Sequence, residues 1–444
     1  MHDVIIIGGG ISGATAAREL GTAGHSVVLL EARDRLGGRT WTSTFPGTDT
    51  PVDLGGMWLG RRDTFRHIYA EASRYQLPVV QSPSTTVSSL FIDGIRHTDP
   101  QALPPGYGAE IENAIRRMTD TAQATRPHLH DPDRTRPLDV SIRQYLSTLG
   151  LSATALTTLS QQASVHYGAP ADEISALYLL GEIATRYTLF APQTLALDVL
   201  DSFRDGTKAL LEALITDAGA EVHLSSPVRR VAQTDDHVEV VTDAEKRFVA
   251  RTAIVATPLN CWHGIDFHPA LHPAKQAVTS QGHAGHFAKV WLLAEGLPDP
   301  SFFAAGTPDG FQWIRTERVT AQGSLLTGFG DPVASPDLYT QAGAQKALAA
   351  YAPEARVKAV HSHDWNQDPY SRGTWIAYRP GWLTTHGPAI SAPEGRIAFA
   401  GGDTSTNFNA LWMDGAVETG IRAAAHTRTL LNTPGAGGPA RSRR

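Results

Sequence analysis

The sequence is poor in sulfur and has no strong excess of one charge. Its 444 residues include a single cysteine, Cys261, and four methionines. A lone cysteine excludes an internal disulfide framework and favours a reducing compartment, so we expect a cytoplasmic protein. Lysine and arginine number 38 against 44 acidic residues, for a net charge of −6. This balance gives no indication of a nucleic-acid partner.

Long apolar runs are also absent. No stretch approaches the roughly 18 consecutive apolar residues of a membrane span, so we expect no membrane partner. No signal peptide precedes the first hydrophobic run, which begins almost at Met1. The final stretch, NTPGAGGPARSRR, is small, polar and basic, and predicts a disordered tail over 433–444.

Glycine is present, and its placement is informative. Val4 to Ile7 is a β-branched run typical of a buried parallel strand. The residues that follow, GGGISG, match G-x-G-x-x-G: Gly8 permits a tight turn, Gly10 lets the backbone approach a pyrophosphate, and Gly13 allows close helix packing. The expected helix, Ser12 to Leu20, directs its N-terminal amides at the phosphates.

A second predicted strand, Ser26 to Leu30, ends on Glu31. A carboxylate there accepts hydrogen bonds from ribose hydroxyls and repels a 2′-phosphate, which disfavours NADP. The order strand, glycines, helix, strand, acid predicts a dinucleotide-binding fold. Ala32, Arg33 and the stretch LGGRT follow; this second glycine pair with an arginine resembles the extended FAD fingerprint of flavoprotein oxidases. The forked guanidinium of Arg39, next to Gly38, suits a pyrophosphate.

Two later segments add glycines beside predicted strands. The stretch VDLGGMWLG, 52–60, lets the backbone pass close to a flat ring. The strand expected at Ile397 to Ala400 precedes a glycine pair and then a helix from about Trp412, whose N-terminal amides are suited to polarise a flavin carbonyl. The cofactor-binding residues predicted in these segments are Gly55, Gly56, Met57, Trp58, Gly402, Asp403 and Met413.

With these motifs the chain is identified as a member of the flavin-containing amine oxidase (monoamine oxidase) family, and it most resembles the bacterial 6-hydroxynicotine oxidases. Further support comes from DGTKALLEAL, AIVATPLNCW, GHAGHFAKVWLL and HDWNQDPYSRGTWIAYRPG. The resemblance implies an α/β fold with a discontinuous Rossmann-like FAD-binding domain, over 1–80, 201–265 and 394–432. An α+β substrate-binding domain would take 81–200 and 266–393.

The resemblance also implies roles for particular residues. Lys289, in HFAKVWLLA, would hold a water near flavin N5. From the residues alone, a lysine in an apolar strand is paired, hydrated or lowered in pKa, or else faces outward from an edge strand. Trp375 and Trp412 would form a cage for the amine, with core packing as the alternative. Trp365 would line the flavin site, and the backbone of Val228 would contact the adenine.

The implied reaction is a hydride transfer from the amine α carbon to flavin N5, giving an imine, with reoxidation by O2 to H2O2. Relatives with a covalent flavin carry a cysteine immediately before the first cage aromatic, where this chain has Thr374, so the FAD is expected to be non-covalent. The expected substrate is a small secondary or cyclic amine, bound near 164–167 and Tyr187. A homodimer is common in the family.

Other readings of the sequence remain. An amino-acid oxidase would use a buried arginine, Arg186 or Arg315, for the carboxylate; a C–C desaturase or a silent flavoprotein would use the same cofactor frame. A cluster of histidines from His263 to His286 is interrupted by prolines and completes no ligand set, so we predict no metal site. No G-x-S-x-G elbow is present, which disfavours a hydrolase.

Overall fold

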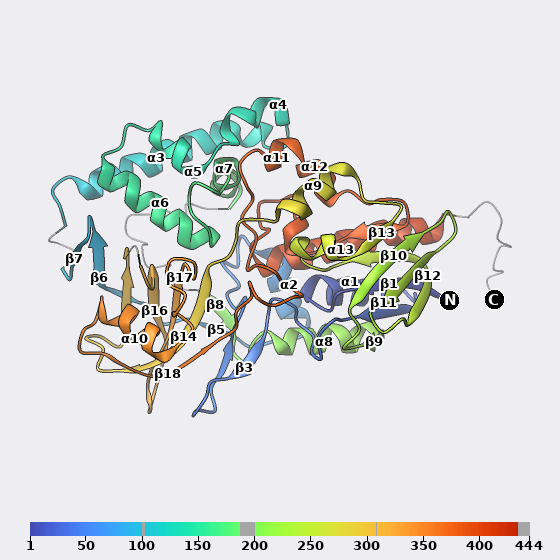
Figure 1. Cartoon of the computed structure of the whole chain (residues 1–444), viewed down its shortest axis with the longest axis horizontal. Helices are drawn as coiled ribbons and strands as arrows, with labels where there is room; N and C mark the ends of the chain where they lie inside the picture. The colour runs from blue at the N-terminus through green and yellow to red at the C-terminus, as the bar shows by residue number, and fades with distance from the viewer. Residues whose placement is uncertain (100–102, 187–199, 308, 434–444) are drawn as a thin grey trace.

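The computed structural model describes residues 1–99, 103–186, 200–307 and 309–433 (Figure 1). Two large sheets organise this part of the chain, and helices cover both of them. The α/β class predicted from the sequence is confirmed.

The first sheet contains the predicted dinucleotide-binding unit. Its eight strands run in the order β13-β10-β11-β12-β1-β2-β9, and β19 pairs with β12. At its centre β1 (His2–Ile7) is parallel to both β2 (Val27–Leu30) and β12 (Arg247–Val255). The other strands are β9 (Glu221–His223), β10 (Val228–Gln233), β11 (Val238–Thr242), β13 (Asp266–His268) and β19 (Ile397–Phe399).

Alternating residues of β1 face two different cores. Val4 and Ile6 pack in a core with alanines of α1 (Ile11–Gly21) and α13 (Met413–Asn432). Ile5 and Ile7 belong to the larger core that continues into the helical layer. A strand buried on both faces must be apolar throughout, which is why this segment carries an unbroken β-branched run.

The second sheet has seven strands in the order β18-β14-β17-β16-β15-β6-β7. The strand β14 (Ala288–Glu295) lies between β18 and β17 and is antiparallel to both, so it has no free edge. The other strands are β6 (Thr86–Ile92), β7 (Ile95–His97), β15 (Phe302–Ala305), β16 (Trp313–Thr320), β17 (Gly323–Gly330) and β18 (Arg356–Ser362).

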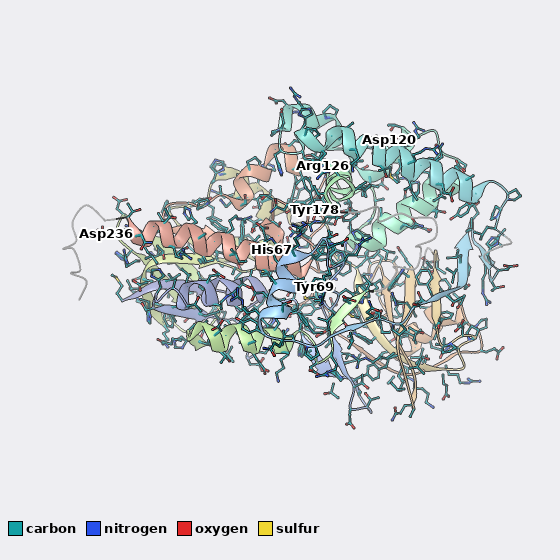
Figure 2. The ribbon with its side chains drawn as sticks, turned by 180° about the vertical axis from the view of Figure 1, so that it is seen from behind. His67, Tyr69, Asp120, Arg126, Tyr178 and Asp236 are labelled. Carbon is teal, nitrogen blue, oxygen red and sulfur yellow. The ribbon has the colours of Figure 1, made fainter. Side chains whose placement is uncertain are left out.

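A helical layer lies above the second sheet at the upper left of Figure 1. Its main helices are α3 (Tyr107–Thr125), α5 (Ile142–Ser147), α6 (Ala153–Tyr167) and α7 (Ala176–Thr185). Tyr178 of α7, labelled in Figure 2, connects this layer to the first sheet's loops, because its hydroxyl accepts a hydrogen bond from the Ala410 amide at 2.9 Å.

Shorter elements complete the described fold. The helices are α2 (Arg66–Arg74), α4 (Pro132–Thr135), α8 (Lys208–Ala218), α9 (Pro273–Gln281), α10 (Gln341–Ala349), α11 (Trp382–Thr385) and α12 (Gly387–Ser391). The strands are β3 (Thr42–Thr44), β4 (Pro51–Asp53), β5 (Val79–Gln81) and β8 (Asp201–Phe203). Within the ranges given above, no helix is both long enough and apolar enough to cross a membrane.

The sequence predictions agree with these elements near the N-terminus and differ further along. The stretch 220–232, whose sequence AEVHLSSPVRRVA is typical of a strand, forms two strands, β9 and β10, and Ser225 between them has a φ of +49°. The domain boundaries stay predictions. Tyr187 and all but the first residue of the predicted tail lie outside the described residues.

Candidate active site

A cavity of about 640 Å³ extends from the first βα turn to the second sheet and the helix α6. Of the 21 residues predicted for the site, 20 line this cavity. They are Lys289, Trp375, Trp412, Gly8, Gly10, Ser12, Glu31, Ala32, Arg33, Gly38, Arg39, Gly55, Gly56, Met57, Trp58, Val228, Trp365, Gly402, Asp403 and Met413. The exception is Gly13.

The glycines of the first turn differ in what they require. Gly8 has a φ of +107°, and a Cβ there would lie 2.9 Å from a backbone oxygen. A Cβ on Gly13 would lie 2.0 Å from the carbonyl oxygen of Gly8, so this glycine permits helix packing rather than ligand contact. A Cβ on Gly10 would have only one atom within 4 Å, at 3.8 Å, because this Cα borders the cavity.

Glu31 is held at the end of β2 by backbone amides. Its side chain accepts hydrogen bonds from the Gly9 amide at 2.7 Å and the Arg33 amide at 2.8 Å, and the residue is 3% exposed. These bonds fix the carboxylate against the glycine turn, where an acid that reads a ribose is expected.

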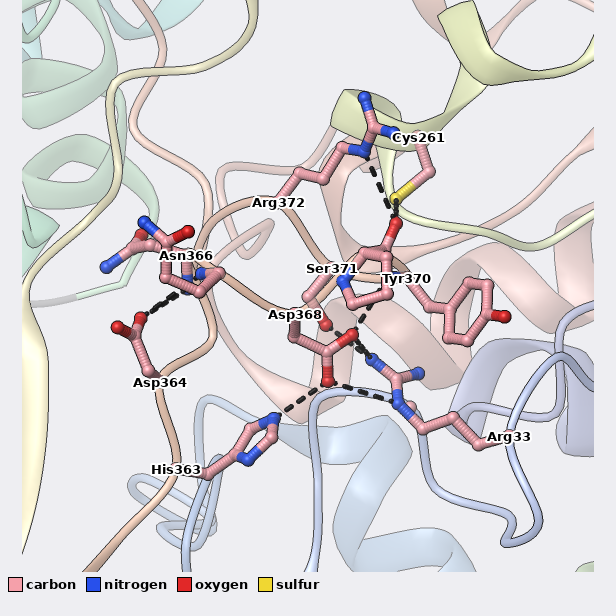
Figure 3. A network of polar contacts seen from close by, with 12 residues as sticks. Arg33, Cys261, His363, Asp364, Asn366, Asp368, Tyr370, Ser371 and Arg372 are labelled. Carbon is pink, nitrogen blue, oxygen red and sulfur yellow. Dashed lines mark hydrogen bonds and ion pairs between the residues drawn. The ribbon is translucent and has the colours of Figure 1, made fainter.

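Arg33 fastens a distant segment to this end of the cavity (Figure 3). Its guanidinium donates to Asp368 at 2.7 and 3.3 Å and to the Ser371 hydroxyl at 2.7 Å. His363 lies 2.7 Å from the same carboxylate. Burial raises the pKa of Asp368, but the bonds from His363 and Arg33 outweigh it and hold that pKa well below its usual range. The neighbouring Tyr370 is part of the cavity wall.

Arg39 joins three segments of the chain. It donates to the Thr374 carbonyl at 2.8 Å and to Asp403 at 2.7 Å. Asp403 also accepts from the Leu259 amide at 2.9 Å. A single guanidinium thus ties the fingerprint loop to the turn after β19 and to the segment before Trp375. The pairing of Arg39 with a pyrophosphate stays a prediction.

Lys289 is buried in the cavity wall rather than exposed at a sheet edge. It is 5% exposed on β14, and its ammonium donates to the carbonyl oxygens of Asp53 and Gly55 and to the Met57 sulfur, each at 2.8 Å. Burial lowers the pKa of Lys289 to about 8, although Asp53 and Glu317 attract the charge. A thioether is the weakest of these three acceptors, so it is the partner that a water would replace.

The two cage tryptophans are tied to the helical layer through their indole nitrogens. Trp375 donates to the His166 carbonyl at 3.0 Å, and Trp412 donates to Glu182 at 3.4 Å. Trp412 is the N-cap residue of α13 and lies against the ring of Phe65, with centroids 4.7 Å apart. Both indoles keep part of their surface open and line the cavity.

The end of the cavity away from the glycine turn contains residues that sequence reasoning missed. One face of α6 lines it at a helical spacing of three and four residues. Aromatic residues of β16, β17 and α3 lie opposite. These lining residues are Thr158, Gln161, Gln162, Val165, His166, Tyr107, Gln312, Trp313 and Phe329. Val165 and His166 fall in the segment expected to line the distal pocket, whereas Ser164 and Tyr167 are buried away from the cavity lining. The spacing on α6 was the available signal.

Arg186 and Arg315, the two arginines considered for the carboxylate of an amino-acid substrate, are bound elsewhere. Arg186 donates to the carbonyls of Asn407 and Phe408, and Arg315 donates to the Pro83 carbonyl and lies 3.4 Å from Glu317. Neither arginine lines the cavity. No group of three or more potential metal ligands occurs among the described histidines, cysteines and acids.

Comparisons with known proteins show what the chain is similar to. A model of flavin containing amine oxidoreductases matches residues 11–427. Nicotine dehydrogenase of Pseudomonas putida (strain DSM 28022 / S16) is 32% identical over 441 residues, covering 97% of this chain and 89% of that protein. (S)-6-hydroxynicotine oxidase of Paenarthrobacter nicotinovorans is 31% identical over 433 residues, covering 94% and 97%. The structure of a putrescine oxidase double mutant gives a TM-score of 0.86 at 25% identity, covering 96% of this chain and 99% of that one.

Proposed function

The chain belongs to the flavin-containing amine oxidoreductase family, and we propose that it is an FAD-dependent oxidase of small secondary or cyclic amines. The observation that carries the proposal is one cavity that joins a dinucleotide-type glycine turn to a buried lysine and two tryptophans. A nucleotide-binding end and an aromatic, water-poor end in the same cavity are what oxidation of an amine by a bound flavin requires.

The residues at the glycine turn fit FAD. Gly10 leaves space where a Cβ would otherwise enter the cavity, and Gly38, with a φ of +56°, lies against it, because a Cβ there would be 3.4 Å from the Gly10 Cα. The hydroxyls of Thr257 and Thr374 are buried without a partner among the described residues, and both residues line the cavity. In the proposal the glycine turn and Ser12 hold the pyrophosphate, Glu31 the ribose, and Val228 the adenine. Arg39 is proposed to pair with the pyrophosphate. The residues proposed to surround the flavin ring are Gly55, Gly56, Met57, Trp58, Trp365, Gly402, Asp403 and Met413.

The chemistry that bound FAD supplies is acceptance of a hydride from the amine α carbon at flavin N5, giving an imine, and passage of the electrons to O2, giving H2O2. The chain's own residues orient the amine and exclude water. Trp375 and Trp412 present two large faces to the amine. Lys289 holds the backbone of Asp53 and Gly55 in place beside the cavity.

The lining supports an uncharged or singly charged substrate. The carboxylates that line the cavity are Glu31, Asp243 and Asp403, and each follows a strand of the first sheet. The end lined by α6 carries no carboxylate or arginine among its described residues. A diamine needs a second acid and an amino acid needs an arginine, so a compact monoamine suits this end best.

A second acceptor is a specific alternative, because two of the relatives are named dehydrogenases, of nicotine and of pseudooxynicotine. On that alternative the same residues would oxidise the amine, but the electrons would pass to a protein or organic acceptor instead of O2.

The test is a panel of primary, secondary, cyclic and amino-acid amines given to the yellow purified protein. Peroxide is measured in air and flavin bleaching is measured anaerobically. With secondary or cyclic amines we expect the wild type to form peroxide in air and its flavin to bleach without oxygen. We expect the Lys289→Met variant to keep its flavin bound but to show neither peroxide nor bleaching. Bleaching without peroxide would favour the second acceptor. No bleaching with any amine would refute the proposed function.

A further inference from the structure

A buried carboxylate lies directly behind the cavity wall and has no role in the function proposed so far. Glu182 is 2% exposed and is the one charged residue of α7, whose sequence is ALYLLGEIAT. Its Oε2 accepts the Tyr167 hydroxyl at 2.6 Å and lies 3.3 Å from Nε2 of His166. Its Oε1 accepts from the Trp412 indole at 3.4 Å. Three donors surround this buried acid, as the burial of a charged group requires.

The contact with Glu182 assigns the tautomer of His166. An ionised carboxylate can only accept hydrogen bonds, so we assign the hydrogen of the imidazole to Nε2, the ring nitrogen that faces Glu182. The other nitrogen, Nδ1, then keeps a lone pair. This is the arrangement in which an acid orients a histidine toward a reacting group.

His166 contacts both tryptophans. Its side chain keeps 13% of its surface exposed and lines the cavity. Its carbonyl oxygen accepts the Trp375 indole at 3.0 Å, and its ring centroid is 6.2 Å from that of Trp412. In the proposed function, an amine held between the tryptophans lies near an imidazole whose Nε2 contacts the Glu182 carboxylate.

We propose that His166 is a catalytic residue that accepts the proton a protonated amine must lose before it is oxidised, and that Glu182 is its positioning residue. This inference rests on the proposed function. The N–H bond of the ammonium breaks, its electron pair stays on the amine nitrogen, and the proton bonds to Nδ1. The imidazolium keeps its Nε2 hydrogen on Glu182 and later gives the new proton to water.

Other charged or titratable groups face this pair. Tyr167 donates to the same carboxylate from α6. Tyr178 of α7 lies near Glu182, and burial raises the pKa of Tyr178 well above its usual range. Arg186, which follows α7, is bound to the Phe408 and Asn407 carbonyls. The indoles of Trp412, the N-cap residue of α13, and of Trp375, which lies between β18 and α11, are neutral.

The expected effect follows from the amine's own ionisation. An amine with a pKa about two units above the assay pH is about 1% neutral. With an internal base the wild type uses the abundant ammonium form, so its kcat/KM falls only shallowly below the amine's pKa. Without that base only the neutral form is productive, and kcat/KM falls about tenfold per pH unit.

The test is the pH profile of kcat/KM from pH 6 to 10, with the best amine of the panel. In His166→Gln the amide can still donate to Glu182 but cannot take a proton. We expect it to lose about 100-fold at two pH units below the amine's pKa and to match the wild type above that pKa, with an unchanged flavin absorption spectrum. Tyr167→Phe, the matched control, removes another bond to Glu182 and should run parallel to the wild type.

Glu182→Gln gives an independent arm, because it removes the charge and leaves the base. Its profile should be steeper than that of the wild type and shallower than that of His166→Gln. An active wild type with parallel profiles in both variants would overturn the inference and leave the proposed function standing. A wild type that oxidises no amine would overturn the proposed function, and the inference with it.

Discussion

Replacing Lys289 by methionine tests whether its buried charge destabilises the folded chain. Burial lowers the pKa of Lys289 from 10.5 to about 8. The folded chain therefore binds this proton less tightly than the unfolded chain does. The charged lysine costs stability below pH 8, and the cost disappears as the pH rises toward 10.5. The difference between the two pKa values is worth about 3 kcal/mol at pH 7.

The assay is urea unfolding of the wild type and Lys289→Met at several pH values. Relative to the variant, the wild type should gain about 2 kcal/mol in free energy of unfolding between pH 7 and pH 9.5. Comparing two proteins cancels every other titrating group. The difference at a single pH is less informative, because methionine leaves the Gly55 carbonyl without its Lys289 donor, at a cost of about 1–3 kcal/mol. The Asp53 carbonyl also loses Lys289 but keeps its bond from the Trp291 indole.

A matched control is Lys358→Met, since that lysine is half exposed and pairs with Glu295 on the surface. Its unfolding free energy should follow the wild type across the whole pH range. The reasoning would be refuted if the unfolding free energy of the Lys289 variant also followed that of the wild type at every pH. The three hydrogen bonds of Lys289 would then compensate fully for the burial of its charge.

Three further outcomes follow from the cofactor end. Asp368→Asn should weaken FAD binding by about 10- to 100-fold in a flavin fluorescence titration, because Arg33 loses a charge-assisted pair; the exposed Glu295→Gln should change nothing, and equal affinities would sink the idea. Gly13→Ala should abolish folded, yellow protein, since its Cβ would lie 2.0 Å from the Gly8 oxygen, while Gly108→Ala, with open space, should be neutral or stabilising in melting temperature. Acid precipitation should release all flavin to the supernatant, because Thr374 has no thiol; yellow pellets would contradict non-covalent binding.

The first forty residues were predictable because their signals are local. A glycine with positive φ at Gly8, and a close helix contact at Gly13, are demands that one turn makes on its own sequence. The strand before Gly8 follows from an unbroken β-branched run. Lys289 is visible as a lone charge in an apolar strand, but the residues alone left an outward-facing lysine open, and only the family resemblance implied a place for it beside the flavin.

The remaining parts of the site depend on contacts between distant segments. Trp412 meets Glu182 across 230 positions, and Arg39 meets Asp403 across 364. No periodicity in either segment specifies such a pairing. Arg39 contacts Asp403 in the folded chain, and its predicted pairing with a pyrophosphate stays a prediction. No local signal in the apolar segment 176–185 marks Glu182, and only its contacts with Tyr167, His166 and Trp412 connect it to the cavity.

The two ends of the cavity differ in how their carboxylates are bound. At the glycine turn the carboxylates are already engaged: Glu31 by backbone amides, and Asp403 by Arg39 and an amide. In the proposed function they shape the cofactor site and do not bind a cationic substrate. At the other end Glu182 contacts Nε2 of His166, so in the further inference an entering ammonium meets a base instead of a permanent counter-ion. An ion pair would hold the amine in its unreactive protonated form, whereas a base converts it to the form that loses hydride. Selection among amines then falls to the shape of the tryptophan walls and the polar face of α6.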